Sequence, residues 1–276
     1  MIRPAGALLF SLVLCLAPGA ARAEEAVGES VLTARFPDRS ISALVTHHAQ
    51  HDPFRRAILL MPGHPGIMKL ESTESYQLKG NFLVRSRRHW LDRETVVLTV
   101  DAPSDEWRGF TGRFRAGPRY AEDIRGLAQE IEKVWGRLPL VLVGTSEGSV
   151  SAFHAARALG SDGVKVIFTA SLFDQSSNSH GLASLDFGEL KVPMLWVHHE
   201  SDPCRWTPYW QAKRHAEKTR SPLITVRSSN PGRGDPCQAF SQHGFVGVER
   251  ETVQAMKRWI ADGTAADVPG PEQDAR

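Results

Sequence analysis

The stretch that most constrains the fold of this chain is residues 140–159. It begins as a short apolar run of Val and Leu, which is typical of a buried strand. It continues through Gly144, Ser146 and Gly148 in a G-x-S-x-G pattern and ends in an Ala-rich run that favours a helix. Strand, G-x-S-x-G and helix in this order predict a nucleophile elbow, a tight turn that exposes a serine.

The residues around Ser146 fit the geometry of such a turn. The turn holds its serine in a strained backbone conformation. Side chains two residues before and after the serine would collide there, so glycine suits Gly144 and Gly148. The backbone amide of Glu147 would face the same space as the serine oxygen. A chain of this length shows the bare pattern by chance about one time in ten, so a serine in an ordinary Gly-rich turn is the alternative.

Length and composition indicate one globular domain behind an export signal. The chain has 276 residues, of which 41% are hydrophobic and 23% charged, enough for one domain with a large core. At the N-terminus, Arg3 precedes an apolar run at 7–17 and the sequence Ala21-Arg22-Ala23. These parts predict a signal peptide at 1–23, removed after Ala23.

We therefore expect a mature domain at 24–262, followed by a flexible tail at 263–276 that contains Pro and several charged residues. The mature protein would be exported, either periplasmic or secreted. No later apolar run is long enough to span a membrane, so we expect no membrane association after cleavage.

The charge balance gives no reason to expect nucleic acid as a partner. Removal of Arg3 and Arg22 lowers the 33 basic residues to 31, which matches the 31 acidic residues. Two local clusters of arginine remain, and for them we favour solvated surface over contact with an anionic substrate. The clusters are Arg85, Arg87 and Arg88, and Arg113, Arg115 and Arg119.

The cysteine count predicts a disulfide. Cleavage removes Cys15 and leaves Cys204 and Cys237, and two cysteines in an exported chain usually pair. The closed loop would stabilise the fold by roughly 3 to 4 kcal/mol in the chain-entropy account. Two buried free thiols are the alternative.

Apolar strands alternate with helical patterns through the rest of the chain, which predicts an α/β fold with a mostly parallel sheet covered by helices on both faces. The first two strands would form an antiparallel edge, and catalytic groups belong at the carboxyl ends of the strands. We expect strands at 30–36, 41–47, 57–61, 95–100, 140–143, 164–170, 192–198 and 223–226, and helices at 81–90, 121–135, 150–159, 208–218 and 252–260.

Serine needs a base to become nucleophilic, and the base needs an orienting acid. In a fold with a G-x-S-x-G elbow the acid and then the histidine follow the serine along the chain. Asp202 lies just past the strand at 192–198, and His243 lies in a loop between the last strand and the last helix. We therefore assign Ser146 as nucleophile, His243 as base and Asp202 as acid.

Other residues compete for these roles. Asp174 follows the strand at 164–170 and could replace Asp202, and Asp235 lies near His243 but inside a turn. For His198 and His199, packing or support of the Asp202 loop is a better interpretation than catalysis.

Three histidines near residue 50 raise a metal site as an alternative, namely His47, His48 and His51. They lack a matching acidic or cysteine cluster, so we expect no metal. The proposed chemistry also needs no cofactor.

The predicted disulfide bears on the site. Cys204 is two residues past Asp202, and Cys237 is six before His243. A bond between them would hold the acid loop to the base loop, although simple stapling of two long loops is the alternative. The oxyanion of an acyl-transfer intermediate needs two donors. The amide of Glu147 is one, and the second should come from the turn after the strand at 57–61.

With these residues in place, residues 30–262 resemble the α/β-hydrolase superfamily. Gly144 to Gly148 matches its elbow, and Leu60 to Gly66 resembles its oxyanion turn, commonly His-Gly-x-Pro-Gly. The match implies that the second donor is the backbone amide of His64. Pro62 stands where the family often has His, which leaves contacts of that side chain in doubt.

More narrowly, three segments resemble a group of exported bacterial α/β-hydrolases. They are residues 80–87, the run from His198 to Cys204, and the run from Asp235 to Phe245.

The resemblance implies a serine hydrolase that cleaves a carboxylic ester through an acyl-enzyme. Only about twenty residues separate the strands at 164–170 and 192–198, where the family carries its lid, so no large cap domain is expected. We expect an open pocket for a small or mid-sized ester. Four aromatic residues could line it, with ordinary packing as the alternative: Trp107, Phe110, Trp206 and Trp210. An amidase or peptidase with the same triad, or a non-catalytic exported binding protein, are the other functions considered.

Overall fold

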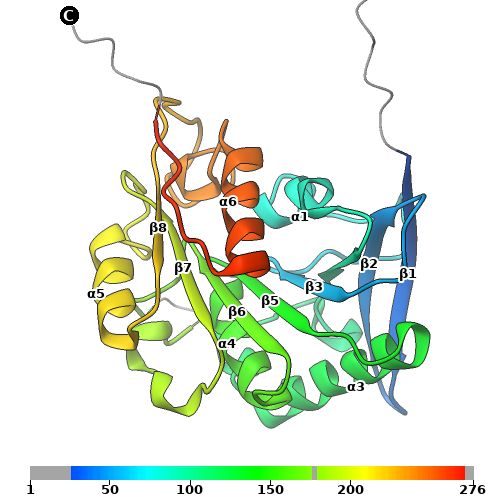
Figure 1. Ribbon diagram of the computed structural model, residues 1–276. Helices are drawn as coiled ribbons and strands as arrows, with labels where there is room; N and C mark the ends of the chain where they lie inside the picture. The colour runs from blue at the N-terminus through cyan, green and yellow to red at the C-terminus, as the bar shows by residue number, and fades with distance from the viewer. Residues whose placement is uncertain (1–25, 176–178, 271–276) are drawn as a thin grey trace, which may run out of the picture.

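The computed structural model describes residues 26–175 and 179–270, so the predicted signal peptide lies outside the described residues. The fold is built on one eight-stranded sheet with the order β1-β2-β4-β3-β5-β6-β7-β8 (Figure 1). Its strands are β1 (Val27–Arg35), β2 (Ser40–His48), β3 (Arg56–Met61), β4 (Thr95–Val100), β5 (Leu140–Thr145), β6 (Val164–Thr169), β7 (Met194–His199) and β8 (Leu223–Val226).

The strand directions confirm the predicted fold class. Strands β1, β2 and β4 pair antiparallel, whereas all pairs from β4 to β8 are parallel. Strand β5 lies between β3 and β6, near the middle of the sheet. Because the carboxyl ends of parallel strands meet at one edge, the loops after β3, β5, β6, β7 and β8 converge there.

Helices cover both faces of the sheet. Figure 1 shows α1 and α6 on one face and α3 and α4 on the other. The helices are α1 (Phe82–Ser86), α2 (Gly112–Arg115), α3 (Pro118–Trp135), α4 (Gly148–Leu159), α5 (Tyr209–Thr219) and α6 (Glu249–Asp262). The 3-10 turns are η1 (Arg87–Trp90), η2 (Ser104–Glu106), η3 (Leu182–Ser184), η4 (Phe187–Glu189) and η5 (Gln242–Gly244).

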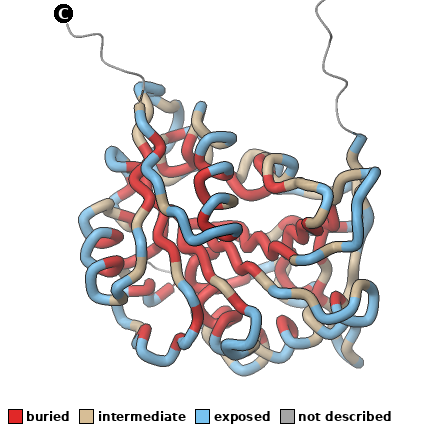
Figure 2. The backbone as a smooth tube through the Cα atoms, in the orientation of Figure 1, coloured by how far each residue is buried: buried red, intermediate tan, exposed pale blue. Residues whose placement is uncertain are grey.

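Two hydrophobic cores follow from the alternation of side chains along each strand. In β3, Leu59 faces the core shared with α3, α4 and α5, whereas Ile58 and Leu60 face the core shared with α1 and α6. Figure 2 shows the resulting band of buried residues along the central strands. Each face of the sheet is therefore covered by a hydrophobic core. The residues predicted to be functional lie in the loops at the edge where the parallel strands end.

The segment between β6 and β7 carries no large cap, as expected. Among its described residues, the only regular elements are the 3-10 turns η3 and η4. The carboxyl-terminal ends of β5 and β6 are therefore left open to the surface on that side. No described helix is long and apolar enough to cross a membrane.

Two segments differ from simple expectation. Helix α2 interrupts the stretch from 104 to 118, which reads as a polar loop in the sequence. The first part of the expected tail lies along β8: Val268 is buried and forms a parallel bridge with Val226. The carboxylate of Asp267 accepts a hydrogen bond from the backbone N–H of Thr225.

Candidate active site

The serine at the end of β5 has the backbone of an elbow. Ser146 has a φ of +54°, in the left-handed region that an L-residue rarely occupies. Its N–H donates to the carbonyl of Thr169 on β6, and its own carbonyl accepts from Ser149 at the start of α4. These backbone bonds hold the strained residue between the strand and the helix.

The two glycines of the pattern are required by contact with backbone atoms. A Cβ on Gly144 would lie 2.2 Å from the carbonyl oxygen of Gly148, and one on Gly148 would lie 2.1 Å from that of Met61. Real carbon atoms do not approach backbone oxygens so closely. The elbow therefore needs glycine at both positions, because any side chain there would collide with backbone atoms.

The base and the acid come from loops after β8 and β7. Nδ1 of His243 lies 3.0 Å from Oδ2 of Asp202, and both side chains are almost completely buried. Asp202 also accepts a bond from the backbone N–H of Cys204. A carboxylate in this position directs the imidazole and stabilises its protonated form.

Thr207 is a third member of this pair that the sequence did not indicate. Its hydroxyl donates to Oδ2 of Asp202 at 2.8 Å and lies 3.1 Å from Nδ1 of His243. Thr207 is fully buried. The sequence signal was no more than a threonine near the acid, so only the fold reveals the contact.

Ser146 and His243 line one pocket of about 390 Å³, within the range of small-molecule sites. No hydrogen bond between the described residues joins the Ser146 hydroxyl to the imidazole, and such bonds often tighten only with substrate present. Gly63, on the turn after β3, approaches the serine closely, since a Cβ there would lie 2.9 Å from Cβ of Ser146.

Two backbone amides remain available beside the serine. His64 and Glu147 both line the pocket, and within the described residues neither backbone N–H has a hydrogen-bond acceptor. Unpaired amides beside a nucleophile are the donors that an oxyanion requires. The sequence had assigned this role to the same two residues.

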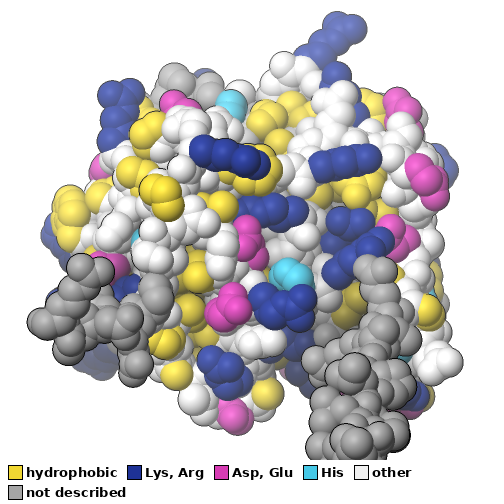
Figure 3. Space-filling view, turned by 90° about the horizontal axis from the view of Figure 1, so that it is seen from above, with side chains coloured by type: hydrophobic (Ala, Val, Ile, Leu, Met, Phe, Trp, Pro, Cys, Tyr) yellow, Lys and Arg dark blue, Asp and Glu magenta, His cyan; other side chains and the backbone are white. Residues whose placement is uncertain are grey.

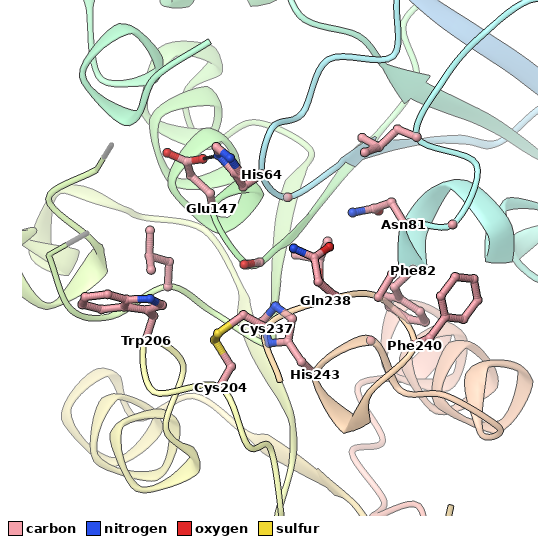
Figure 4. A pocket seen from close by; sticks show the side chains of 18 residues that line it. His64, Asn81, Phe82, Glu147, Cys204, Trp206, Cys237, Gln238, Phe240 and His243 are labelled. Carbon is pink, nitrogen blue, oxygen red and sulfur yellow. Dashed lines mark hydrogen bonds and ion pairs between the residues drawn. A yellow bond between two sulfur atoms is a disulfide. The ribbon is translucent and has the colours of Figure 1, made fainter. Parts of the chain in front are cut away.

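The disulfide expected from the sequence joins Cys204 to Cys237, at a sequence separation of 33. Both cysteines line the pocket, next to His243 (Figure 4). The bond therefore links the loop of the acid to the loop of the base. Arg85 on α1 also holds the base loop, because its guanidinium donates to the carbonyl of Gly244 as well as to that of Gly80 before α1.

The competing acids are engaged elsewhere. Oδ1 of Asp174 accepts a bond from the side-chain amide of Gln211, and Oδ1 of Asp235 accepts from the backbone N–H of Cys237. Asp202 alone of the three considered is bonded to His243.

The two histidines at the end of β7 are also engaged. Nε2 of His198 accepts from the backbone N–H of Ser171, and burial lowers the pKa of His198 to about 3. Nδ1 of His199 accepts from the N–H of Ser201, and its Nε2 lies 3.0 Å from Oγ of Ser228. Both histidines support the loops around the acid, and neither lines the pocket.

The remaining histidine cluster is aromatic packing. The rings of His47 and His51 contact each other and the ring of Phe54. Within residues 26–175 and 179–270, no group of three or more His, Cys, Asp or Glu is arranged to hold a metal.

The interpretation of the arginine clusters as solvated surface was wrong for several members. Arg115 is fully buried, and Arg85 and Arg87 are mostly buried and paired with Glu249 and Glu29. Arg115 is buried because it lies under the turn after β3, where its guanidinium donates to the hydroxyl of Ser151 and to the carbonyl of Pro65. Arg119 is paired with Asp105, and Arg88 and Arg113 are exposed or nearly so.

The expected aromatic lining was correct at one position of four. Only Trp206 lines the pocket, whereas Trp210 is 59% exposed on α5. Trp107 donates its indole N–H to the carbonyl of Ala102, and Phe110 stacks under Arg115. The apolar and aromatic lining is Leu78, Phe82, Leu172, Trp206, Ala239 and Phe240.

The face of the molecule seen in Figure 3 carries charged side chains of both signs. Figure 3 shows Lys and Arg side chains spread over one face, with acidic side chains and hydrophobic patches between them. This distribution agrees with the near-neutral charge and offers no continuous basic surface for nucleic acid on that face.

No protein-family model and no curated protein sequence matches this chain. Solved structures do. A lidless α/β serine hydrolase from Xanthomonas campestris is 16% identical, with a TM-score of 0.56 over 84% of this chain and 94% of that one. An α/β serine hydrolase homologue from Coxiella burnetii is 19% identical, with a TM-score of 0.54 over 81% and 94%.

The protein Est1E from Butyrivibrio proteoclasticus is 12% identical, with a TM-score of 0.58 over 84% of this chain and all of its own. These likenesses, together with the sheet order, show that the chain has the α/β-hydrolase fold.

Proposed function

We propose that the protein is a serine hydrolase that cleaves small or mid-sized carboxylic esters. The observation that carries the proposal is the pocket itself, where the strained Ser146 lies with His243, which is bonded to a buried Asp202. Residues that the surrounding structure holds in a strained backbone conformation are concentrated at active sites. Several neighbours of the same fold are named serine hydrolases or esterases, which supports the assignment.

The reaction follows from the positions of these groups. Oγ of Ser146 attacks the ester carbonyl carbon while Nε2 of His243 takes its proton, and Asp202 stabilises the resulting imidazolium. The carbonyl π-electrons move to the oxygen, which accepts hydrogen bonds from the backbone amides of His64 and Glu147. Collapse of the intermediate breaks the bond to the alcohol oxygen, which takes the proton from His243.

Water completes the cycle. His243 removes a proton from water as the water oxygen attacks the acyl-enzyme carbonyl, and the second intermediate collapses to release Ser146 and the carboxylic acid. The proton then returns to Oγ of Ser146. No cofactor enters any step.

The pocket supports an ester of modest size. Its lining is mainly apolar, and no large cap lies over it among the described residues. We also propose export to the periplasm or the medium, supported by the sequence of residues 1–23 and by the disulfide. The intact mass of the exported protein should correspond to a chain that begins at Glu24.

Covalent labelling tests the catalytic assignment. A fluorophosphonate should label the wild type at Ser146, and Ser146→Ala should lose labelling and about 10⁴-fold or more in kcat on an aryl ester. Ser161→Ala, at an exposed loop serine, serves as the matched control and should keep both. Full turnover by Ser146→Ala would reject the proposal, and matched ester and amide substrates would separate an esterase from an amidase.

A further inference from the structure

A buried ion pair lies behind the turn after β3 and has no part in the proposed mechanism. The Arg115 side chain is 1% exposed and that of Glu147 is 4% exposed, with Nη2 and Oε2 3.8 Å apart. Oε2 of Glu147 also lies 3.1 Å from Nδ1 of His64. The three side chains form a chain of contacts that runs from α2, through the elbow, to the turn.

Arg115 is held in place from several sides. Its Nη1 donates to Oγ of Ser151 at 2.6 Å, and its Nη2 donates to the carbonyl of Pro65 at 3.2 Å. The guanidinium stacks 3.8 Å above the ring of Phe110. A Cβ on Gly66 would lie 2.5 Å from Nη2, so the turn is fitted to the arginine.

Burying a guanidinium is costly unless it is paired, and burial lowers the pKa of Arg115 while the charge of Glu147 opposes that change. The charge of Arg115 therefore lies beside the Glu147 carboxylate and helps to fix its position. Since an ionised carboxylate only accepts hydrogen bonds, Nδ1 of His64 must carry the proton. When the imidazole carries a single proton, on Nδ1, its Nε2 has a lone pair. Nε2 has no partner among the described residues.

This lone pair belongs to a side chain that faces the substrate. The His64 side chain is 58% exposed although its partner is buried, and both residues line the pocket. Figure 4 shows the His64 and Glu147 side chains together on the wall across the pocket from His243 and the disulfide. The backbone amide of the same His64 is the proposed oxyanion donor, so the ring belongs to a residue that would also contact the scissile carbonyl.

We propose that Arg115 and Glu147 are positioning residues that present the His64 imidazole as a fixed hydrogen-bond acceptor, so that the enzyme prefers esters with a hydroxyl group beside the scissile bond. The inference rests on the proposed ester hydrolysis. Most of the remaining lining is apolar, so the ring is one of few groups able to recognise such a hydroxyl. A site built to bind a hydroxyl discriminates strongly against an analogue that lacks the donor.

Matched esters test the preference. The acyl pair is an aryl hydroxyacetate and the aryl methoxyacetate of the same alcohol, and the alcohol pair is 2-hydroxyethyl and 2-methoxyethyl acetate. Each ratio of kcat/KM is divided by the ratio of the hydroxide-catalysed rates, which removes intrinsic reactivity. In the wild type at least one normalised ratio should favour the hydroxyl ester by about 10-fold or more.

The variant His64→Phe keeps a planar ring and the backbone amide but removes the acceptor, and it should bring that ratio close to one. Arg115→Met should give an intermediate ratio, because the ring is then less well oriented. His180→Phe, at an exposed histidine outside the pocket, is the matched control and should keep the wild-type ratio. A ratio of two substrates on one preparation does not depend on the folded fraction.

The outcomes separate this inference from the proposed function. If the wild type hydrolyses both esters of each pair with normalised ratios near one, or if His64→Phe discriminates as strongly as the wild type, the role of His64 is overturned while ester hydrolysis stands. If no ester is turned over and no fluorophosphonate adduct forms, the proposed function itself fails.

Discussion

The elbow and the pair of loops that carry the acid and base hold their residues by different means. The elbow at residues 144–148 lies at the end of a central strand and is fixed mainly by contacts with the neighbouring strand and with the start of α4. Ser146 bonds to Thr169 of the neighbouring strand, and two glycines let the chain pass within van der Waals distance of itself.

The loops of Asp202 and His243 leave the sheet after a few backbone bonds at the strand ends, such as that from the N–H of Glu200 to the carbonyl of Val226. They are long excursions after β7 and β8, and side chains hold them together. The disulfide between Cys204 and Cys237, the hydroxyl of Thr207 and the guanidinium of Arg85 each join one segment to another. The comparison shows that the serine of an elbow can be encoded locally, whereas the positions of His243 and Asp202 depend on contacts between distant residues.

The largest effect is expected from Gly148→Ala in the elbow. Its Cβ would meet backbone at Met61, which cannot move without shifting β3, so the free energy of unfolding should fall by about 3 kcal/mol or more. Urea unfolding and ester turnover measure the change. Gly109→Ala is the control, since a Cβ there meets nothing within 4 Å. Equal stability of the two variants would show that the elbow is not sterically fixed.

The double variant Cys204→Ser, Cys237→Ser removes the covalent link between the loops. With the cysteines at a sequence separation of 33, the chain-entropy account predicts a loss of about 4 kcal/mol in the free energy of unfolding. Turnover should also fall, by about 10-fold, as His243 loses its fixed position. Wild type treated with a thiol reductant should behave like the variant. An unchanged unfolding curve would mean that the other loop contacts suffice.

A smaller effect is expected from Thr207→Val. The change keeps the shape but removes the donor to Asp202, so kcat should fall by about 10-fold with KM nearly unchanged, and the free energy of unfolding by about 1 to 2 kcal/mol. Thr219→Val removes a comparable buried bond on α5, to the carbonyl of His215. That control should lose stability without the drop in kcat. A similar kcat for both variants would contradict a role for Thr207 in holding the acid.

The last effect concerns His154 on α4 and is confined to acid pH. Burial lowers its pKa to about 4, below the usual value of 6.5, so between these values the unfolded state binds more protons. Its contribution to stability is therefore present above pH 6.5 and is lost as the pH falls toward 4, by at most about 1.4 kcal/mol per pH unit.

Unfolding of His154→Leu between pH 7 and pH 4.5 should show a shallower slope than the wild type. Phe153→Leu changes packing at the neighbouring position without removing a titratable group and should keep the wild-type slope. Parallel curves for His154→Leu and the wild type would contradict the shifted pKa.

The same contrast explains what the sequence could predict. Apolar runs such as residues 95–100 and 140–145 identify central strands, because a strand buried on both faces must be apolar throughout. Asp202 and His243 were found because chain order and strand ends restrict where an acid and a base can lie. Both inferences use only local pattern and order along the chain.

Contacts between segments could not be read in this way. Arg115 lies in a charged run that is typical of surface, and nothing near it in sequence reveals that α2 carries it beneath Pro65. Phe240 joins the pocket wall only because the disulfide brings its loop there, whereas Trp210 points outward from α5. A side chain's partners are fixed by tertiary packing, which residue type and spacing do not specify.

The stretch that carries Asp267 and Val268 has a consequence for self-association. Strand β8 has only four residues and lies at the edge of the sheet. An uncovered edge strand has free N–H and C=O groups with which a strand of another polypeptide can pair. Val268 pairs with Val226 on this strand, and the carboxylate of Asp267 accepts a hydrogen bond from the backbone N–H of Thr225. Asp267 and Val268 thus cover part of this edge of the sheet, where another copy of the chain could otherwise pair.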